Sequence, residues 1–151
     1  MKQTDNFKFD EANVMNELVY RNLSEDAKRQ ICAWKYGGEY DLYNLPAYEE
    51  MQVRQIGFMN PKSEKNYYGF WDESILVGFV NILEEKEEVF IGIGVNPDLC
   101  NKHYGQRMLL ITYEISKKLY PDKPLYLEVR TWNIRAVKCY QKAGFRIDGQ
   151  A

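Results

Sequence analysis

The chain has 151 residues, enough for one domain with a buried core, and its formal net charge is −2 at pH 7. That mildly acidic balance argues against nucleic acid as a partner, and no apolar run has the ~20 residues of a membrane span. One histidine, His103, and three widely separated cysteines make no zinc-binding pattern, so we expect no metal cofactor. Unpaired cysteines also favour the reducing environment of the cytoplasm.

The N-terminal part of the chain predicts a leader followed by a single domain. Residues 1–16 are polar and weakly patterned, so we expect mixed order there, with one domain over residues 17–151. Ser24 is a good helix N-cap because acidic residues follow it, and Gly37-Gly38 is a strong helix breaker. The expected elements are a strand at 18–23, a helix from Ser24 to a point before Gly37, and a second helix from Pro46 to about Phe58.

The middle of the chain is typical of an antiparallel meander. In its last strand Ile93 and Val95 share one face, while Phe90, Gly92 and Gly94 share the other. The two glycines leave the backbone bare, which permits a bulge or the close approach of a ligand. A packing accommodation is the alternative. The expected strands are 66–71, 75–83 and 89–95, with turns at 72–74 and 84–88.

After Pro97 the pattern changes from strand to helix and then alternates. Apolar residues at helical spacing predict a helix over 105–119, and period-two alternation predicts a strand over 125–131. Asn133 is a good N-cap for a last helix that ends at Gly144. Strands that alternate with helices predict an α/β (α+β) domain whose mixed sheet is covered by helices.

The segment from Val95 to Arg107 runs from a strand end through a loop into a helix N-terminus. Free backbone N–H groups at such a terminus, with the helix dipole behind them, form an anion site. Gly105 allows a phosphate to approach the backbone, and Lys102 and Arg107 add positive charge. The alternative is an ordinary strand-to-helix turn with solvated cations.

The last helix carries a second candidate site. Asn133, Ala136 and Tyr140 are spaced i, i+3 and i+7, so they lie on one helical face. That face presents an amide, a small contact surface and a phenol to one ligand. Because the chain has 12 tyrosines, a Tyr140 that is simply packed is the alternative.

Together, these two segments resemble the GNAT superfamily of N-acetyltransferases. The loop after Val95-Asn96-Pro97 is similar to the family's pyrophosphate loop, Q/R-x-x-G-x-G/A. The run Leu127-Glu128-Val129-Arg130 is similar to the ribosomal-protein alanine acetyltransferase branch. The last helix matches the family pattern N-x-x-A-x-x-x-Y-x-x-x-G-F at Asn133, Ala136, Tyr140, Gly144 and Phe145.

The resemblance implies a mixed, mostly antiparallel central sheet flanked by helices, with acetyl-CoA as the cosubstrate. The loop departs from the family where Cys100 replaces the usual Gln or Arg and His103 replaces the first glycine. A histidine tolerates a positive φ better than a β-branched residue does, and His103 could instead donate to a phosphate. The residues implied to bind the cosubstrate are Ile93, Val95, Asn101, Lys102, His103, Tyr104, Gly105, Gln106, Asn133, Ala136 and Tyr140.

The resemblance also implies roles in direct transfer of an acetyl group to an amine. Backbone N–H groups of a bulged strand at Ile93–Val95 would stabilise the oxyanion, and Tyr140 would protonate the departing thiolate. Glu128 is the first candidate for the general base, and Glu87 and Glu88 are the alternative. Each of these carboxylates also fits an ion-paired strand residue or a solvated turn. The expected acceptor is a primary amine, either a small molecule or a protein N-terminus.

Domains of this family normally continue with two more strands, whereas Arg146–Ala151 has room for one at most. Either the chain is shortened there or another chain completes the sheet, which suggests a homodimer. Tyr40-Asp41-Leu42-Tyr43 is the expected acceptor-side loop. The alternative function is a non-catalytic acyl-CoA-binding or interaction domain in which Cys100 and His103 have eroded the pyrophosphate loop.

Overall fold

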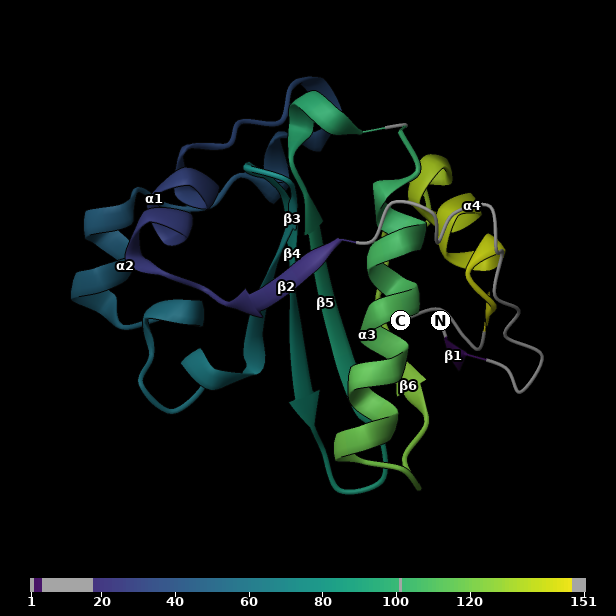
Figure 1. Cartoon of the computed structure of the whole chain (residues 1–151). Helices are drawn as coiled ribbons and strands as arrows, with labels where there is room; N and C mark the ends of the chain where they lie inside the picture. The colour runs from purple at the N-terminus through teal and green to yellow at the C-terminus, as the bar shows by residue number, and fades with distance from the viewer. Residues whose placement is uncertain (1, 4–17, 101, 148–151) are drawn as a thin grey trace.

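The computed structural model describes residues 2–3, 18–100 and 102–147 (Figure 1). Asn101 and the expected leader, apart from Lys2–Gln3, lie outside the described residues. The described strands form a mixed sheet in the order β2-β3-β4-β5-β6-β1-β7, in which β5 and β6 are parallel and the other neighbours antiparallel. The strands are β1 Lys2–Gln3, β2 Val19–Asn22, β3 Tyr67–Asp72, β4 Ile75–Glu84, β5 Val89–Val95, β6 Leu125–Tyr126 and β7 Phe145–Arg146.

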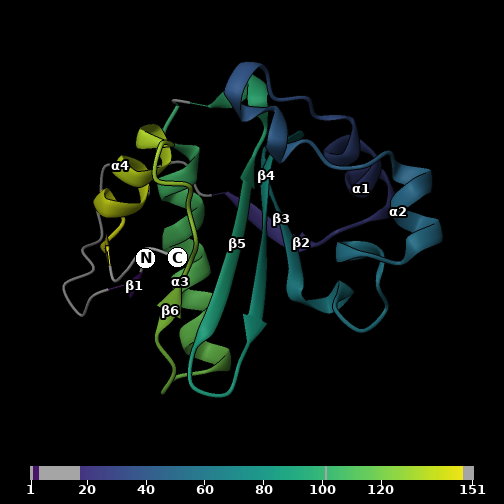
Figure 2. The same cartoon turned by 180° about the vertical axis from the view of Figure 1, so that it is seen from behind.

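Helices cover both faces of this sheet. α1 and α2 pack on one face, and α3, with α4 beside it, packs on the other, as Figures 1 and 2 show from opposite sides. This arrangement confirms the expected fold class. The α-helices are α1 Glu25–Ala33, α2 Tyr48–Arg54, α3 Tyr104–Leu119 and α4 Ile134–Lys142, and the short 3-10 helices are η2 Gly38–Tyr43, η3 Gly57–Met59, η4 Glu64–Asn66 and η5 Pro97–Leu99.

Each face of the sheet has its own buried core. On the α3 side, Val80 and Ile91 pack with Met108. On the α1 side, Trp71 packs with Ile31. Because side chains alternate along a strand, β5 presents one set of residues to α3 and the other set to α1. Every helix in the described part of the chain is too short or too polar to cross a membrane.

Local sequence signals set most helix ends. Ser24 caps α1 as predicted, because its side chain accepts a hydrogen bond from the Ala27 N–H at 3.1 Å. The helix predicted over 46–58 is shorter in the structure, since Gln55 directly follows α2 with a left-handed φ of 51°. A left-handed residue ends the helical hydrogen-bond ladder, and Gly57 follows with a second positive φ.

The strand predicted over 125–131 is also shorter than expected. Among the described residues, β6 pairs with β5 at two positions, and residues 127–133 belong to no strand. The predicted alternation persists in the burial, with Leu127 buried and Glu128 exposed. The other edge of β6 pairs with β1, which lies between β6 and β7. Beyond Tyr126 the chain separates from β5, and the candidate site lies in the space between them.

β5 leads to the candidate site and is regular. It pairs with β4 over its whole length without a register shift, so the bulge predicted at Ile93–Val95 is wrong. Gly94 lies opposite Phe79, and a Cβ at Gly94 would overlap the Phe79 ring. The packing alternative therefore explains Gly94, because an aromatic ring covers its bare backbone.

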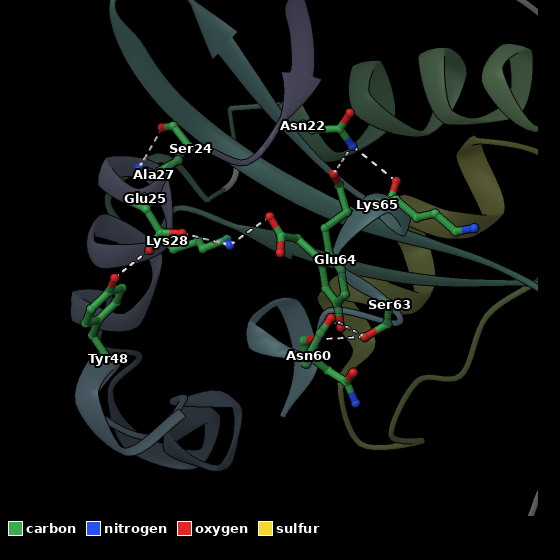
Figure 3. A network of polar contacts seen from close by, with 12 residues as sticks. Asn22, Ser24, Glu25, Ala27, Lys28, Tyr48, Asn60, Ser63, Glu64 and Lys65 are labelled. Atoms are coloured by element: carbon green, nitrogen blue, oxygen red, sulfur yellow. Dashed lines mark hydrogen bonds and ion pairs between the residues drawn. The ribbon is translucent and has the colours of Figure 1, made fainter. Parts of the chain in front are cut away.

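An ion network around the buried side chain of Lys28 joins α1 to α2 and η4 (Figure 3). Lys28 is 2% exposed, and its Nζ lies 3.1 Å from Glu25 Oε1 and 3.3 Å from Glu64 Oε1. The other Glu25 oxygen accepts a hydrogen bond from the Tyr48 hydroxyl. The bonds from Tyr48 and Lys28 lower the pKa of Glu25 because they stabilise its charged form. The network fixes α1, whose C-terminal cap Trp34 reaches the candidate site.

Candidate active site

A cleft of about 1520 Å³ collects the chemistry-bearing segments of the chain. It lies between β5 and the 127–131 segment, beyond the point where they pair. The N-terminus of α3, helix α4 and the 36–45 segment complete its walls, and Figure 2 shows η2 beside the end of β5. The predicted cosubstrate-binding residues that line it are Ile93, Val95, His103, Tyr104, Gly105, Gln106, Asn133, Ala136 and Tyr140.

The end of β5 turns two backbone N–H groups toward the cleft. The Asn96 N–H donates to the Val77 carbonyl at 2.8 Å, and hydrogen-bonded pairs alternate along an antiparallel ladder. Ile93 and Val95 therefore direct their backbone groups away from β4. On that side the Val95 carbonyl accepts a hydrogen bond from the Tyr36 hydroxyl at 2.6 Å. These two N–H groups face the cleft without needing a bulge.

The N-terminus of α3 has the geometry expected of an anion site. His103 adopts a φ of 65° and makes no side-chain capping bond, so a residue other than glycine occupies the left-handed conformation. Gly105 lets α3 and α4 approach closely, since a Cβ there would lie 3.1 Å from Cys139 Sγ. The Tyr104 hydroxyl donates to Asp72 at 2.6 Å and anchors the first turn to β3. Backbone N–H groups of a helix start stabilise negative charge.

Positive charge in the cleft comes from α4 and from Arg130 before it. Arg135, Lys138 and Arg130 line the cleft, where they suit the phosphates of an anionic ligand. Lys102, which was predicted to bind the cosubstrate, is exposed and lies outside the cleft lining. The sequence gives little sign of these cations, because single Lys and Arg residues on a helix are usually solvated.

Asn133 joins α4 to the 36–45 segment. It is 6% exposed, and its Oδ1 caps α4 by accepting a hydrogen bond from the Ala136 N–H at 3.2 Å. Its Nδ2 donates to the Tyr43 hydroxyl at 3.1 Å. Tyr43 also packs against Tyr40 and Trp132. The loop predicted to face the acceptor therefore closes over the start of α4 and bounds the cleft.

Tyr140 faces the cleft among Tyr36, Tyr43, Cys100 and Cys139. Burial raises the pKa of its hydroxyl strongly, and negative charge on these four neighbours would raise that pKa further. The hydroxyl is therefore protonated at neutral pH, which is the state that a general acid requires.

The carboxylates predicted as general bases lie in different places. Glu128 lines the cleft from the segment after β6 and is exposed. Its neighbour Tyr126 donates a hydrogen bond to Glu85, which with burial raises the pKa of Tyr126 to about 12. Glu87 and Glu88 belong to the turn between β4 and β5 and are not part of the cleft lining.

Three further residues of the cleft have no signal in the sequence: Trp34, Tyr36 and Asn81. Tyr36 reaches Val95 across 59 positions, so no short motif contains both. Asn81 Oδ1 is shielded from solvent and has no hydrogen-bond partner among the described residues.

The cysteines and the histidine of the cleft do not gather into a cluster of metal ligands. In the described part of the chain, no three His, Cys, Asp or Glu side chains come together in a way that could hold a metal ion. Burial raises the pKa of the Cys100 thiol, and it raises that of Cys139 to about 11. Both thiols are therefore protonated at neutral pH.

Comparisons with known proteins agree on one family and fold. The model of the acetyltransferase (GNAT) family matches residues 29–145, and no curated protein sequence matches the chain. A chimera of spermidine N-acetyltransferase SpeG from Vibrio cholerae and hSSAT is similar in structure, with a TM-score of 0.73, 20% identity, and coverage of 88% of this chain and 82% of that one. An acetyltransferase of the GNAT family from Streptococcus pneumoniae has a TM-score of 0.63, 23% identity, and coverage of 88% and 87%. One from Bacillus anthracis has a TM-score of 0.67, 15% identity, and coverage of 99% and 86%.

Proposed function

Because this chain belongs to the acetyltransferase (GNAT) family, whose cosubstrate is acetyl-CoA, we propose that it transfers the acetyl group of acetyl-CoA directly to a primary amine. The observation that carries this proposal is the meeting of Tyr140 with the outward N–H groups of Ile93 and Val95 in one cleft. Transfer from a thioester needs both kinds of group, since an oxyanion forms at the carbonyl and a thiolate leaves.

Each proposed catalytic residue has one task in this reaction. The amine nitrogen bonds to the acetyl carbon, and the N–H groups of Ile93 and Val95 stabilise the oxyanion that results. When the carbon–sulfur bond breaks, Tyr140 gives its proton to the sulfur. Glu128, directly or through water, takes the proton that the amine loses. Its exposure suits a base that exchanges protons with solvent.

The start of α3 is the proposed site for the pyrophosphate of the cosubstrate. His103 adopts a left-handed backbone and makes no side-chain capping bond, so no cap at His103 competes with an anion for the first N–H groups of the helix. Asn133 contributes indirectly, because it caps α4, the helix that carries Ala136 and Tyr140. The proposed cosubstrate-binding residues are Ile93, Val95, Asn101, Lys102, His103, Tyr104, Gly105, Gln106, Asn133, Ala136 and Tyr140.

Several finer points stay predictions. The acceptor is a small-molecule amine or a protein N-terminus, and the spermidine named for the Vibrio cholerae chimera is an amine of the first kind. The likeness to the ribosomal-protein alanine acetyltransferase branch depends on Leu127-Glu128-Val129-Arg130. We also propose a cytoplasmic enzyme with one domain over 17–151 that needs no metal. The described part of the sheet gives the predicted homodimer no specific support, because β1 covers the edge of β6.

Calorimetric titration of the intact chain with acetyl-CoA tests the proposal. We expect binding with a dissociation constant between roughly 1 µM and 1 mM, the usual range of enzyme substrates, and weaker binding of ATP as the control. No heat at millimolar acetyl-CoA would contradict the proposal. Binding without release of free thiol in the presence of amines would favour the non-catalytic acyl-CoA-binding alternative.

A further inference from the structure

The part of the cleft that faces α1 is lined by aromatic rings. Trp34 packs against Phe79 with ring centroids 6.2 Å apart, and Phe79 stacks with Tyr67 at 6.4 Å. Farther along, Phe90 packs against Tyr126 at 5.5 Å. All of these rings line the cleft, so they offer apolar surface to whatever enters it. We call this part the acceptor groove, formed by Trp34, Tyr67, Phe79, Asn81, Phe90 and Gly92.

The floor of the acceptor groove has one unsatisfied polar atom. Asn81 pairs with Gly92 across the β4–β5 ladder, and its shielded Oδ1 has no hydrogen-bond partner among the described residues. A buried acceptor that is left unpaired destabilises the protein, because it has lost its hydration without gaining a partner. Asn81 also lines the cleft, so a rotation of its side chain would present this oxygen to an N–H donor of a bound ligand.

Gly92 keeps this floor open. A Cβ at Gly92 would lie 3.5 Å from the Phe90 ring and 3.6 Å from Asn81 Cβ, which are ordinary contact distances. Unlike Gly94, Gly92 is therefore not required by packing, and its bare backbone leaves at least the space of a methyl group open between Phe90 and Asn81.

The charges in the cleft disfavour an acceptor with several positive charges. Glu128 is the one carboxylate among the described residues that line the cleft, whereas Arg130, Arg135, Lys138 and Lys142 are cations. A polyamine such as spermidine would have to bury several ammonium groups with a single counter-charge, which is costly. Aromatic faces attract one cation well and solvate an apolar body better than water does.

We infer that the acceptor is a primary monoamine carried on an aromatic or similarly flat apolar body, which lies in the acceptor groove with its nitrogen near Asn81. This inference deepens the proposed acetyl transfer and depends on it. It separates the chain from the spermidine N-acetyltransferase that it resembles in fold.

A panel of amines tests the inference through the rate of thiol release from acetyl-CoA. The probes are 2-phenylethylamine, spermidine and a short peptide with a free N-terminus. We expect kcat/KM for 2-phenylethylamine to exceed that for each of the others by about tenfold or more, since contacts with several rings are worth at least 1.4 kcal/mol. A preference for spermidine or the peptide, or no transfer to any of the three, would overturn the inference.

Two glycine substitutions locate the acceptor. Gly92→Ala keeps ordinary contacts and should leave the fold and acetyl-CoA binding unchanged, while it raises KM for 2-phenylethylamine by about tenfold. The matched control is Gly37→Ala, because a Cβ at Gly37 meets nothing within 4 Å and Gly37 is not part of the cleft lining. Equal KM values for the two variants would overturn the inference.

Asn81→Asp distinguishes a failed inference from a failed function. A second carboxylate should lower the preference for 2-phenylethylamine over spermidine by about tenfold, because it adds a counter-charge to the groove. An unchanged preference would contradict the place given to the amine. If acetyl-CoA does not bind at all, the proposed function itself fails. If it binds and spermidine is the better acceptor, the proposed function stands and only this inference falls.

Discussion

At the scale of single residues, Tyr140 is the side chain on which the proposed chemistry depends. Its hydroxyl lies among Tyr36, Tyr43, Cys100 and Cys139, and burial keeps it protonated. We expect Tyr140→Phe to lower kcat for thiol release by about a hundredfold while the acetyl-CoA dissociation constant changes little, because general acids contribute rate rather than binding. Stopped-flow detection of free thiol measures the first quantity and calorimetry the second.

The control for Tyr140→Phe removes a tyrosine hydroxyl that lies outside the cleft. Tyr20 lies on β2 and is 43% exposed, so Tyr20→Phe should leave kcat unchanged. If Tyr140→Phe retains the rate of Tyr20→Phe, then Tyr140 is a packed residue and another group protonates the thiolate.

His103 carries backbone strain at the proposed anion site. Its φ of 65° is left-handed, where residues other than glycine are strained by about 1–2 kcal/mol. Glycine removes that strain but adds freedom to the unfolded chain, so we expect His103→Gly to stabilise the fold by up to about 1 kcal/mol in urea titrations. Gln55→Gly, at a φ of 51° beyond α2, should give a similar gain. Only the His103 variant should alter acetyl-CoA affinity, and a loss of stability in it would show that the imidazole makes a native contact.

Among the elements, α1 is joined to η4 by Lys28, and to α2 by Glu25, which binds both Lys28 and Tyr48 (Figure 3). Lys28 is 2% exposed, whereas Glu25 and Glu64 are 62% and 51% exposed. We expect Lys28→Met to change the free energy of unfolding by less than about 1 kcal/mol, since water can solvate both carboxylates. Replacing both carboxylates by Gln should cost about 3 kcal/mol, because a buried ammonium then lacks a counter-charge. Urea unfolding followed by circular dichroism measures both.

An exposed ion pair on α2 provides the control for the expected difference between Lys28→Met and the double Gln variant. Glu50 and Arg54 are 53% and 56% exposed, with atoms 3.4 Å apart. Glu50→Gln should change stability by less than about 0.5 kcal/mol. If Lys28→Met lowers the free energy of unfolding as much as the double Gln variant does, then the whole ion network is required for stability. The expected difference between the two variants would then be wrong.

At the scale of the whole molecule, the same network links stability to pH. The pKa of Glu25 lies below its ordinary value of 4.5, first because of the Tyr48 hydrogen bond and then because of that from Lys28. A lowered folded pKa stabilises the fold above the unfolded value and loses this contribution as pH falls through the folded pKa. We therefore expect the free energy of unfolding to fall on acidification below about 4.5.

Removal of the Tyr48 hydroxyl should weaken that dependence. Tyr48→Phe deletes the largest cause of the lowered Glu25 pKa, so the variant should lose stability at pH 7 but approach the parent at pH 3. Urea titrations across this range, with Tyr20→Phe for comparison, measure the difference. Parallel curves for the parent and Tyr48→Phe would show that the bond does not contribute to the pH dependence.

Features that depend on neighbouring residues could be predicted from the amino-acid sequence. The cap at Ser24, the bounds of β5 and the cap at Asn133 follow from local hydrogen bonds and from alternation, and each is seen in the structure. The last helix also carries its Asn133, Ala136 and Tyr140 face into the cleft as spacing alone requires.

Features that depend on contacts between distant segments could not be predicted and are seen only in the folded chain. β6 ends after two residues because its partner β5 leads away from it. β5 needs no bulge, because the N–H groups of Ile93 and Val95 already point into the cleft. The bond from Tyr36 to Val95, the ring of Phe79 over Gly94 and the shielded oxygen of Asn81 join parts of the chain that no motif contains. Local propensity fixes the elements, but packing between segments far apart in the sequence fixes the shape and charge of the cleft.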